Sequence, residues 1–353
     1  MFIVFEYLNY NQRVENTRDL DLVWLVDDLK PIFGLIKNTK ILITGASGHL
    51  GYYILHFFLK CNRDLNLNIS ITTTSKGILQ KDFAMFRNDL QHIEGDVTST
   101  SFVNSLEKFD TIIHLAGYAQ PSKFMGDPDS TIRSNTLAVT GLINKINSNG
   151  RFLFISSSEV YANSGFKTNN ELSVGTINSS NPRSTYVYSK LLGESLCNFY
   201  SNSRNLDAKV ARLSMTYGPG IKQGDTRALS QFLFQALKEG QVKLIDQGMA
   251  LRQYLYVSDA VSALLKILFL GEQNLYNIGS GSVGDISIAD AAAKISHLTN
   301  TKLILAEDNL NLLSSQPQVN LDISRFEYEF GRLSNINFNE GISRTISWLN
   351  QQQ

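Results

Sequence analysis

Short continuous apolar runs alternate with longer segments of helical periodicity from residue 40 to residue 214. Continuous apolar runs of four or five residues are typical of strands that are buried on both faces of a parallel sheet. The intervening segments place apolar residues three and four positions apart, as helices that cover a sheet do. This alternation predicts an α/β fold with a doubly wound parallel sheet. The expected strands lie at 40–44, 68–71, 92–97, 111–117, 152–155 and 210–214, and the expected helices include 52–61, 129–148 and 186–200.

The pattern becomes less regular after a Tyr-Gly-Pro-Gly turn at 217–220. No internal repeat and no flexible linker separates the two regions, so we expect the second region to be woven against the first rather than strung behind it. The expected elements of the second region are helix 226–239, strand 242–245, helix 258–270, a glycine-rich loop at 278–284, helix 286–299, strand 302–305 and a closing helix at 339–350.

The first 38 residues precede the regular pattern. Residues 19–37 carry apolar side chains at helical spacing, and Pro31 is expected to end or kink a helix there. We interpret this segment as an arm that packs on the main body or on a partner subunit. The start of the chain has an apolar run interrupted by Glu6 with no basic residue before it, which argues against a secretory signal peptide.

Charge and cysteine content narrow the functional classes. The chain has 32 basic and 32 acidic residues, so it shows no electrostatic footprint for nucleic acid or for an anionic membrane. No apolar run approaches the roughly eighteen residues of a membrane-spanning helix. The two cysteines, Cys61 and Cys197, lie far apart in helical patterns and are expected to be reduced thiols. These features predict a cytoplasmic protein.

A glycine-rich turn separates the first expected strand from the helix that follows it. Its glycines have the spacing GxxGxxG, which allows a tight turn, close approach of a pyrophosphate to the backbone, and close packing of helix on strand. The helix N-terminus then faces the phosphates. The candidate cofactor-binding residues of this turn are Gly45, Ser47, Gly48, His49, Leu50 and Gly51.

Three further strand ends carry residues suited to the same cofactor. Asp96, followed by Val97, is placed to accept a hydrogen bond from an adenine amino group, and Ala116 and Gly117 are small enough to leave room for the cofactor. The segment 72–76 lacks the acid that would hold the ribose 2′-hydroxyl of NAD. Its hydroxyl groups and lysine suit a 2′-phosphate, so both NAD and NADP remain open.

These features predict three parts of the chain. An N-terminal helical arm covers residues 1–38, and an NAD(P)-binding Rossmann-type domain covers 39–212. A smaller substrate-binding lobe, interwoven with that domain, covers 213–353.

Acid–base chemistry is concentrated around the strand at 152–155 and the helix that follows. The strand runs directly into a serine-rich turn that includes Ser157. Tyr186 and Lys190 share one face of the helix, one turn apart. An ammonium near a phenol favours the phenolate, which can take a proton at neutral pH. Ser157 is placed to hold a substrate oxygen beside that phenol. The five histidines lack metal-ligand spacing, so no metal site is predicted.

The ordered motifs resemble those of the extended short-chain dehydrogenases/reductases that act on nucleotide sugars. The resemblance runs from about Lys40 to Trp348 and rests on ITGASGHLG, GDV at 95–97, HLAG at 114–117, SSSEVY, YVYSK, the YGPG turn, LRQYLYVSDA at 251–260 and YNIGSG at 276–281. Within that family, HLAGYAQPSKFMGDPDSTIRSNT, PRSTY and GDTRALSQFL look most like the UDP-glucuronate decarboxylase (UDP-xylose synthase) branch.

The chain departs from the family pattern at four places. Ser157 stands where threonine is usual, Met215 where an asparagine is common, and Ala162 where a glycine often follows SEVY. The acid after the second strand is also absent. The Met215 difference bears on the identity of the substrate more than on the chemistry.

The resemblance implies an enzyme that oxidises a sugar at C4 with bound NAD(P) and then decarboxylates or dehydrates it, in a homodimer formed through two helices. Glu159 is the candidate for the additional acid–base work, and Tyr186 and Lys190 also contact the cofactor. The expected catalytic residues are Ser157, Glu159, Tyr186 and Lys190. The expected substrate-binding residues are Ser158, Arg227 and Arg252, the arginines as partners for a carboxylate or phosphate.

Three readings stay open beside the decarboxylase. A 4,6-dehydratase is disfavoured by Gln253, because dehydratases usually have an aspartate after the arginine at 252. A nucleotide-sugar epimerase or an NADPH-dependent 4-keto-sugar reductase is favoured by the acid-free segment 72–76, but simple epimerisation at C4 has no need of Glu159. A non-catalytic cofactor-sensing or scaffold protein is opposed by the intact serine, tyrosine and lysine. The nucleotide and the sugar stay open as well.

Overall fold

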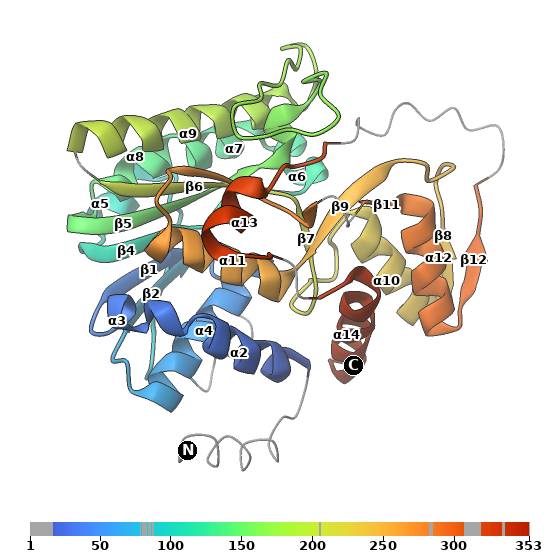
Figure 1. Cartoon of the computed structure of the whole chain (residues 1–353), viewed down its shortest axis with the longest axis horizontal. Coiled ribbons are helices and arrows are strands. Elements are labelled where there is room, and N and C mark those ends of the chain that lie inside the picture. The colour runs from blue at the N-terminus through green and yellow to red at the C-terminus, as the bar shows by residue number, and fades with distance from the viewer. Residues whose placement is uncertain are drawn as a thin grey trace.

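A seven-stranded parallel sheet forms the centre of the computed structural model (Figure 1). The structure describes residues 17–77, 79, 83, 86, 88–204, 206–281, 285–306, 319–333 and 336–352. The strand order is β10-β6-β5-β4-β1-β2-β3, which confirms the predicted α/β class with a doubly wound, Rossmann-type sheet. The strands are β1 (Lys40–Thr44), β2 (Ser70–Ser75), β3 (Gln91–Glu94), β4 (Phe109–His114), β5 (Ile146–Ser157), β6 (Asp207–Leu213) and β10 (Leu275–Ile278). The first thirteen residues, on which the signal-peptide prediction rests, and residues 282–284 of the expected glycine-rich loop lie outside the described residues.

The apolar strands fill two cores, because successive side chains of a strand enter opposite faces of the sheet. Ile43 and Leu153 belong to one core, whereas Leu42, Phe152 and Phe154 belong to the other. The two sets of helices cover opposite faces in Figure 1. On the first face lie α4 (His49–Leu65) and α11 (Val257–Leu270), and on the second lie α5 (Thr100–Ser105), α8 (Leu137–Ile143) and α9 (Ser184–Arg204). The short helices α6 (Pro121–Gly126) and α7 (Pro128–Asn135) adjoin α9.

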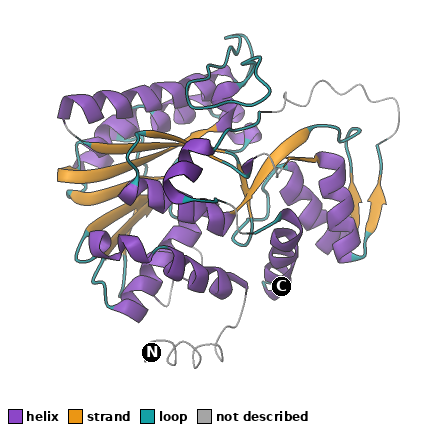
Figure 2. Cartoon of the chain, viewed as in Figure 1, coloured by secondary structure: helices purple, strands orange, loops and turns teal. Residues whose placement is uncertain are grey.

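A smaller group of elements lies beside the central sheet (Figure 2). It holds a three-stranded sheet of order β11-β9-β7 and a two-stranded sheet of β12 and β8. Its elements are β7 (Met215–Tyr217), α10 (Ala228–Glu239), β8 (Gln241–Lys243), β9 (Leu251–Tyr256), β11 (Asp285–Ser287), α12 (Ile288–Thr299), β12 (Lys302–Ile304) and α14 (Phe338–Gln351). The same half of the chain also supplies α11 and β10 to the central layer, and α13 (Ser324–Phe330) contacts β10. We therefore propose that the boundary between the two domains lies near residue 212. After this boundary the chain returns to the first domain with α11 and β10.

The expected helix 129–148 is wrong in its centre and at its end. The structure has two helices there, α7 and α8, and residues from 146 onward already belong to β5. The break lies at Thr136 (φ −127°, ψ −70°), whose hydroxyl donates to the carbonyl of Ile132 at 2.8 Å. A threonine hydroxyl that bonds the carbonyl four residues earlier competes with regular helical bonding. The apolar periodicity continues across the break and therefore did not reveal it.

The N-terminal arm packs on the main body. It forms α2 (Thr17–Asp28), the 3-10 helix η2 (Lys30–Ile32) and α3 (Phe33–Ile36), with the expected interruption at Pro31. Helix α2 contacts α4, α11 and α14, so it touches helices from both ends of the chain.

One buried carboxylate of the arm joins these helices. Asp21 is 0% exposed and accepts hydrogen bonds from the hydroxyl groups of Tyr53, at 2.9 Å, and Tyr256, at 2.8 Å. Arg344 of α14 forms an ion pair with the same carboxylate. Burial raises the pKa of Asp21, and the tyrosines and Arg344 oppose that rise. Burial of the charged carboxylate costs free energy, and its three partners, the two tyrosines and Arg344, offset that cost.

Both cysteines are buried, Cys61 in one core and Cys197 in the other, and they form no disulfide, as the sequence predicts. Burial raises the pKa of the Cys61 thiol to about 12, so the thiol stays protonated at neutral pH. Within the described part of the chain, no helix has the length and apolar character needed to cross a membrane.

Removal of this carboxylate is expected to destabilise the protein. Asp21→Ala leaves two buried hydroxyls and Arg344 without their shared partner, and breaking a buried pair in this way costs about 3–5 kcal/mol. The free energy of unfolding from urea titrations measures the loss. The matched control in the same helix is Asp27→Ala, because Asp27 pairs with Lys30 at the surface with 61% of its side chain exposed. Equal effects of the two substitutions would contradict a joining role for Asp21.

Candidate active site

A cavity of about 1090 Å³ lies between the central sheet and the smaller group of elements. The chain leaves β1 toward β2 and returns to β4 on the other side of β1, so the sheet has its topological switch point there, where open α/β sheets bind ligands. All residues predicted from the glycine turn line this cavity, as do Ala116 and Gly117. The predicted catalytic and substrate-binding residues line it as well.

The turn after β1 has the backbone geometry that its glycines predict. Gly45 has a φ of +69°, and a Cβ there would lie 2.7 Å from the backbone nitrogen of Ala116. A Cβ at Gly51 would lie 2.7 Å from the carbonyl oxygen of Gly45. Helix α4 begins at His49, so its first amides have no carbonyl partner within the helix and suit an anion. These residues fit the pyrophosphate of a dinucleotide.

Two of the predicted cofactor residues lie apart from this cavity. Neither Asp96 nor Val97 is among its lining residues. Asp96 accepts from the backbone nitrogen of Thr98 at 2.9 Å and pairs with Lys76 at 2.8 Å. The sequence suggests Lys76 as a partner for the 2′-phosphate of NADP. In the structure, Lys76 is already paired with the carboxylate of Asp96.

Ser157, Tyr186 and Lys190 meet where β5 ends against α9. The Ser157 side chain lies close enough to the Tyr186 phenol to lower the pKa of that phenol. The Lys190 ammonium donates to the carbonyl of Ile155 at 2.7 Å and lies 5.8 Å from the centroid of the Tyr186 ring. The predicted spacing of four residues thus places Lys190 one turn after Tyr186 on α9, where its ammonium bonds to β5, the strand that carries Ser157.

Burial controls the protonation of both groups. It raises the pKa of the Tyr186 phenol well above its usual range, the charge of Glu159 adds to that rise, and the Ser157 side chain opposes it. Burial lowers the pKa of Lys190 to about 7, and Glu194 opposes that shift. The sequence predicts a phenolate at Tyr186. Formation of this phenolate therefore needs more positive charge near Tyr186 than the residues of the site supply.

Glu159 forms a bidentate ion pair with Arg183, which the sequence did not predict. The Arg183 Nε donates to Oε2 of Glu159 at 3.1 Å, and Nη2 donates to Oε1. Arg183 stands three residues before Tyr186, in the PRSTY motif. The motif could have identified Arg183 as a site residue. It does not indicate that Glu159 is the partner of Arg183.

The two predicted arginines lie on different elements of the second region. Arg227 precedes α10 and is held by Asp225, with its Nε 3.0 Å from Oδ2. Arg252 lies on β9 and donates to the carbonyl of Leu251 at 2.7 Å. Burial lowers the pKa of Arg252, Arg183 lowers it further, and Glu159 raises it. Arg252 therefore lies within electrostatic reach of the Glu159 ion pair, and all three residues line the cavity. Ser158 begins the short 3-10 helix η4 (Ser158–Tyr161).

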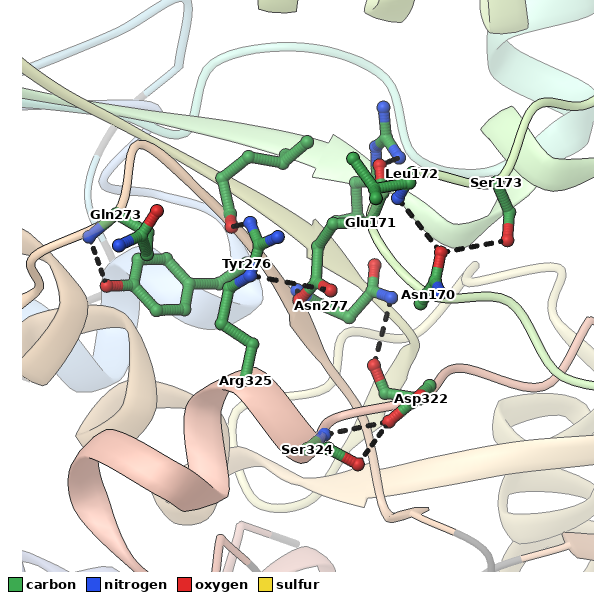
Figure 3. Close-up of polar contacts among 12 residues, drawn as sticks. Asn170, Glu171, Leu172, Ser173, Gln273, Tyr276, Asn277, Asp322, Ser324 and Arg325 are labelled. Carbon is green, nitrogen blue, oxygen red and sulfur yellow. Dashed lines mark hydrogen bonds and ion pairs between the residues drawn. The ribbon is translucent and has the colours of Figure 1, made fainter.

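A buried polar network lies next to the site and ties it to distant segments. The Asn277 backbone nitrogen donates to Glu171 at 2.9 Å, and its side-chain nitrogen donates to the carbonyl of Asp322 at 3.0 Å (Figure 3). Its side-chain oxygen accepts from the hydroxyl of Tyr161 at 2.7 Å. Arg212 donates to that hydroxyl at 2.7 Å and pairs with Glu194 of α9. The YNIGSG motif that contains Asn277 was the only sequence signal for this network.

His114, at the end of β4, joins β1 to α7. Its Nδ1 is 2.8 Å from the Thr44 hydroxyl and its Nε2 is 2.9 Å from the carbonyl of Ser134. Burial lowers its pKa to about 4, so the imidazole is neutral. Over the described ranges, no three His, Cys, Asp or Glu side chains form a group that could hold a metal ion.

The sheet order, the glycine turn at β1 and the serine, tyrosine and lysine at β5 and α9 define a Rossmann-type dinucleotide-binding protein. The sequence profile of the NAD dependent epimerase/dehydratase family matches residues 41–279. The chain belongs to that family.

Individual relatives extend this comparison. UDP-glucuronic acid decarboxylase 6 of Arabidopsis thaliana is 28% identical over 314 residues, covering 87% of this chain and 87% of the relative. Among solved structures, an epimerase from Methanothermobacter thermautotrophicus is similar with a TM-score of 0.75 and 18% identity, covering 93% and 96% of the two chains. MoeE5, in complex with UDP-glucuronic acid and NAD, has a TM-score of 0.70 and 22% identity, covering 89% and 100%.

The burial of Lys190 predicts a pH dependence of stability. Its pKa is lowered to about 7 from the ordinary 10.5, so between these values the unfolded chain binds more protons than the folded protein. The free energy of unfolding, relative to that of Lys190→Met, should therefore rise from about pH 7 to about pH 10, by at most about 1.4 kcal/mol per pH unit. Urea unfolding of both proteins across this range measures the difference. A difference that is constant or falls with pH would show that the lysine is not desolvated.

Proposed function

We propose that the protein oxidises a nucleotide sugar at C4 with bound NAD and then removes carbon dioxide from C5. The observation that carries this proposal is the presence of Ser157, Tyr186 and Lys190 in one cavity with Glu159. The first three supply the groups for reversible oxidation of a hydroxyl. Glu159 and the neighbouring arginines supply charges that suit a second step on a carboxylated sugar. The names of the curated relatives support the same chemistry.

The residues divide the chemistry between them. Ser157 orients the C4 oxygen while Tyr186, as the phenolate, takes the proton of the C4 hydroxyl. NAD, when bound, supplies the exchange of a hydride with C4. The C4 ketone then lies β to a carboxylate on C5. The bond from C5 to that carboxylate breaks, its electron pair is delocalised onto the ketone oxygen, and carbon dioxide leaves. C5 takes a proton, a transfer that we assign to Glu159, and Tyr186 returns its proton to the C4 oxygen as C4 regains the hydride that it lost in the oxidation.

Two related reactions use the same residues. If C5 carries a hydroxymethyl group, removal of the C5 proton expels water, and Glu159 is again the candidate for the proton transfer. An epimerase or an NADPH-dependent reductase is favoured by a single feature, the acid-free end of β2. We favour NAD as the cofactor because the carboxylate of Asp96 next to Lys76 would repel a 2′-phosphate.

The reaction can be tested without added reductant. Purified protein incubated with UDP-glucuronate is expected to give a product lighter by the mass of carbon dioxide, followed by mass spectrometry. Tyr186→Phe and Glu159→Gln should each lower the rate by about 10²-fold to 10⁴-fold, because each removes a proton-transfer group. The matched control is Tyr200→Phe, since Tyr200 lies on the same helix but does not line the cavity, so this variant should keep full activity.

Other product masses would assign other reactions. Loss of water from UDP-glucose would make the protein a dehydratase. An isomerised sugar, or consumption of added NADPH, would rule out both lyase reactions and favour the epimerase or the reductase.

We propose further that the protein forms a homodimer through α7, α8 and α9. These helices contact one another and display large apolar side chains on the surface. The exposed residues are Ile132 (44%), Leu137 (53%), Tyr188 (47%), Leu192 (51%) and Phe199 (60%). Apolar patches of this kind mark protein–protein contacts, and a second copy of the chain is a partner with the same patch.

A charge in this patch should dissociate the dimer. Leu192→Glu is expected to halve the mass measured by light scattering, because a carboxylate would be buried at the centre of the contact. Leu305→Glu is the matched control, since Leu305 is 69% exposed outside these helices. A monomeric parent protein, or a dimer that withstands Leu192→Glu, would contradict this interface.

A further inference from the structure

The ion pair between Glu159 and Arg183 forms part of the cavity wall. Both residues line the cavity, and their side chains are only 20% and 18% exposed. Nε and Nη2 of the guanidinium engage the two oxygens of the carboxylate. This fork is the arrangement by which arginine binds any carboxylate, including one that belongs to a ligand.

Aromatic packing keeps Arg183 beside the catalytic phenol. Its guanidinium carbon lies 5.2 Å from the centroid of the Phe124 ring. The Tyr186 ring stacks on Phe124 with centroids 4.2 Å apart and an angle of 11° between the planes. Phe124 is itself buried, with 1% of its surface exposed. Contact with this ring does not depend on which carboxylate the guanidinium binds, so Arg183 can exchange one carboxylate for another in place.

The electrostatic surroundings favour an additional anion at this wall. Arg252 is close enough to the pair that the charge of Arg183 lowers its pKa and the charge of Glu159 raises it. Two guanidinium groups therefore act on the same part of the cavity. A substrate carboxylate placed there would be attracted by both, whereas Glu159 would be repelled by it and displaced.

We propose that Arg183 determines specificity for a carboxylate on the substrate sugar, and that Glu159 occupies the binding position of that carboxylate until the substrate displaces it. The exchange keeps the buried guanidinium paired and frees Glu159 in the cavity next to Tyr186. A neutral hydroxymethyl group cannot replace a carboxylate on the guanidinium, so Glu159 stays bound when a neutral hexose enters. The site thus selects nucleotide uronates over nucleotide hexoses. This inference rests on the proposed function in that the ligand is a nucleotide sugar.

The two members of the pair are expected to have opposite effects on binding. Calorimetry measures the dissociation constants of UDP-glucuronate and UDP-glucose, in a Tyr186→Phe background that prevents turnover. The ratio of the two constants gives the preference for the uronate. The contribution of the nucleoside diphosphate cancels in this ratio, because both ligands carry it. Arg183→Gln should lower the preference for the uronate by about tenfold to a hundredfold, because a charged hydrogen-bonded pair is lost. Glu159→Gln should raise it by about tenfold, because the competing carboxylate is removed. Arg183→Lys keeps the charge without the fork, and a smaller fall is expected.

The matched control is Arg63→Gln, which removes an arginine that is 59% exposed on α4 and should leave the ratio unchanged. A parent ratio near one, a ratio unaffected by Arg183→Gln, or a fall on Glu159→Gln would each overturn the proposal. A purely structural ion pair would leave the ratio unchanged in both variants. If the uronate is preferred as described but the unsubstituted protein releases no carbon dioxide, the proposed reaction is wrong and the specificity inference stands.

Discussion

The buried ion pair between Glu194 and Arg212 is the interaction on which the geometry of the site depends. It joins α9 to β6, with both side chains about one-tenth exposed, and Ser156 of β5 donates to the same glutamate. Ser156 immediately precedes Ser157, and Glu194 lies one helical turn after Lys190. The ion pair and the Ser156 hydrogen bond together therefore hold β5, which carries Ser157, and β6 against the helix that carries Tyr186 and Lys190. Removing one partner would leave an uncompensated charge in the core, at a cost of several kcal/mol.

A second set of polar contacts connects the two sides of the cavity. Asp21 near the start of the chain binds Tyr256 at the end of β9 and Arg344 in α14. Strand β9 also carries Arg252 into the cavity wall. Asn277 ties β10 to Glu171 and to the segment at Asp322 (Figure 3). Contacts from segments far apart in the chain thus restrain both β9, which carries Arg252, and β10.

The protonation of Tyr186 and Lys190 and the pairing of Glu159 depend on the charges that a ligand brings into the cavity. Burial keeps the Tyr186 phenol protonated and lowers the pKa of Lys190 to about 7. Glu159 is held by Arg183 in the structure. Each of these groups needs a change in the local charge before it can take part in proton transfer. This dependence would couple the chemistry to binding, because an anionic sugar and a cationic cofactor ring bring the missing charges.

The sequence by itself determined the parallel sheet, the glycine turn and the shared helix face of Tyr186 and Lys190. These features follow from local rules, because side-chain alternation sets the faces of a strand and four-residue spacing sets one face of a helix. Only the tertiary structure decided the partners of Glu159 and Asp21 and the association of Asp96 with Lys76. Arg183 lies 24 residues from Glu159 and Arg344 lies 323 residues from Asp21, and no local periodicity relates residues at such separations. Their pairing arises because chain folding brings charges into a core where each must find a partner.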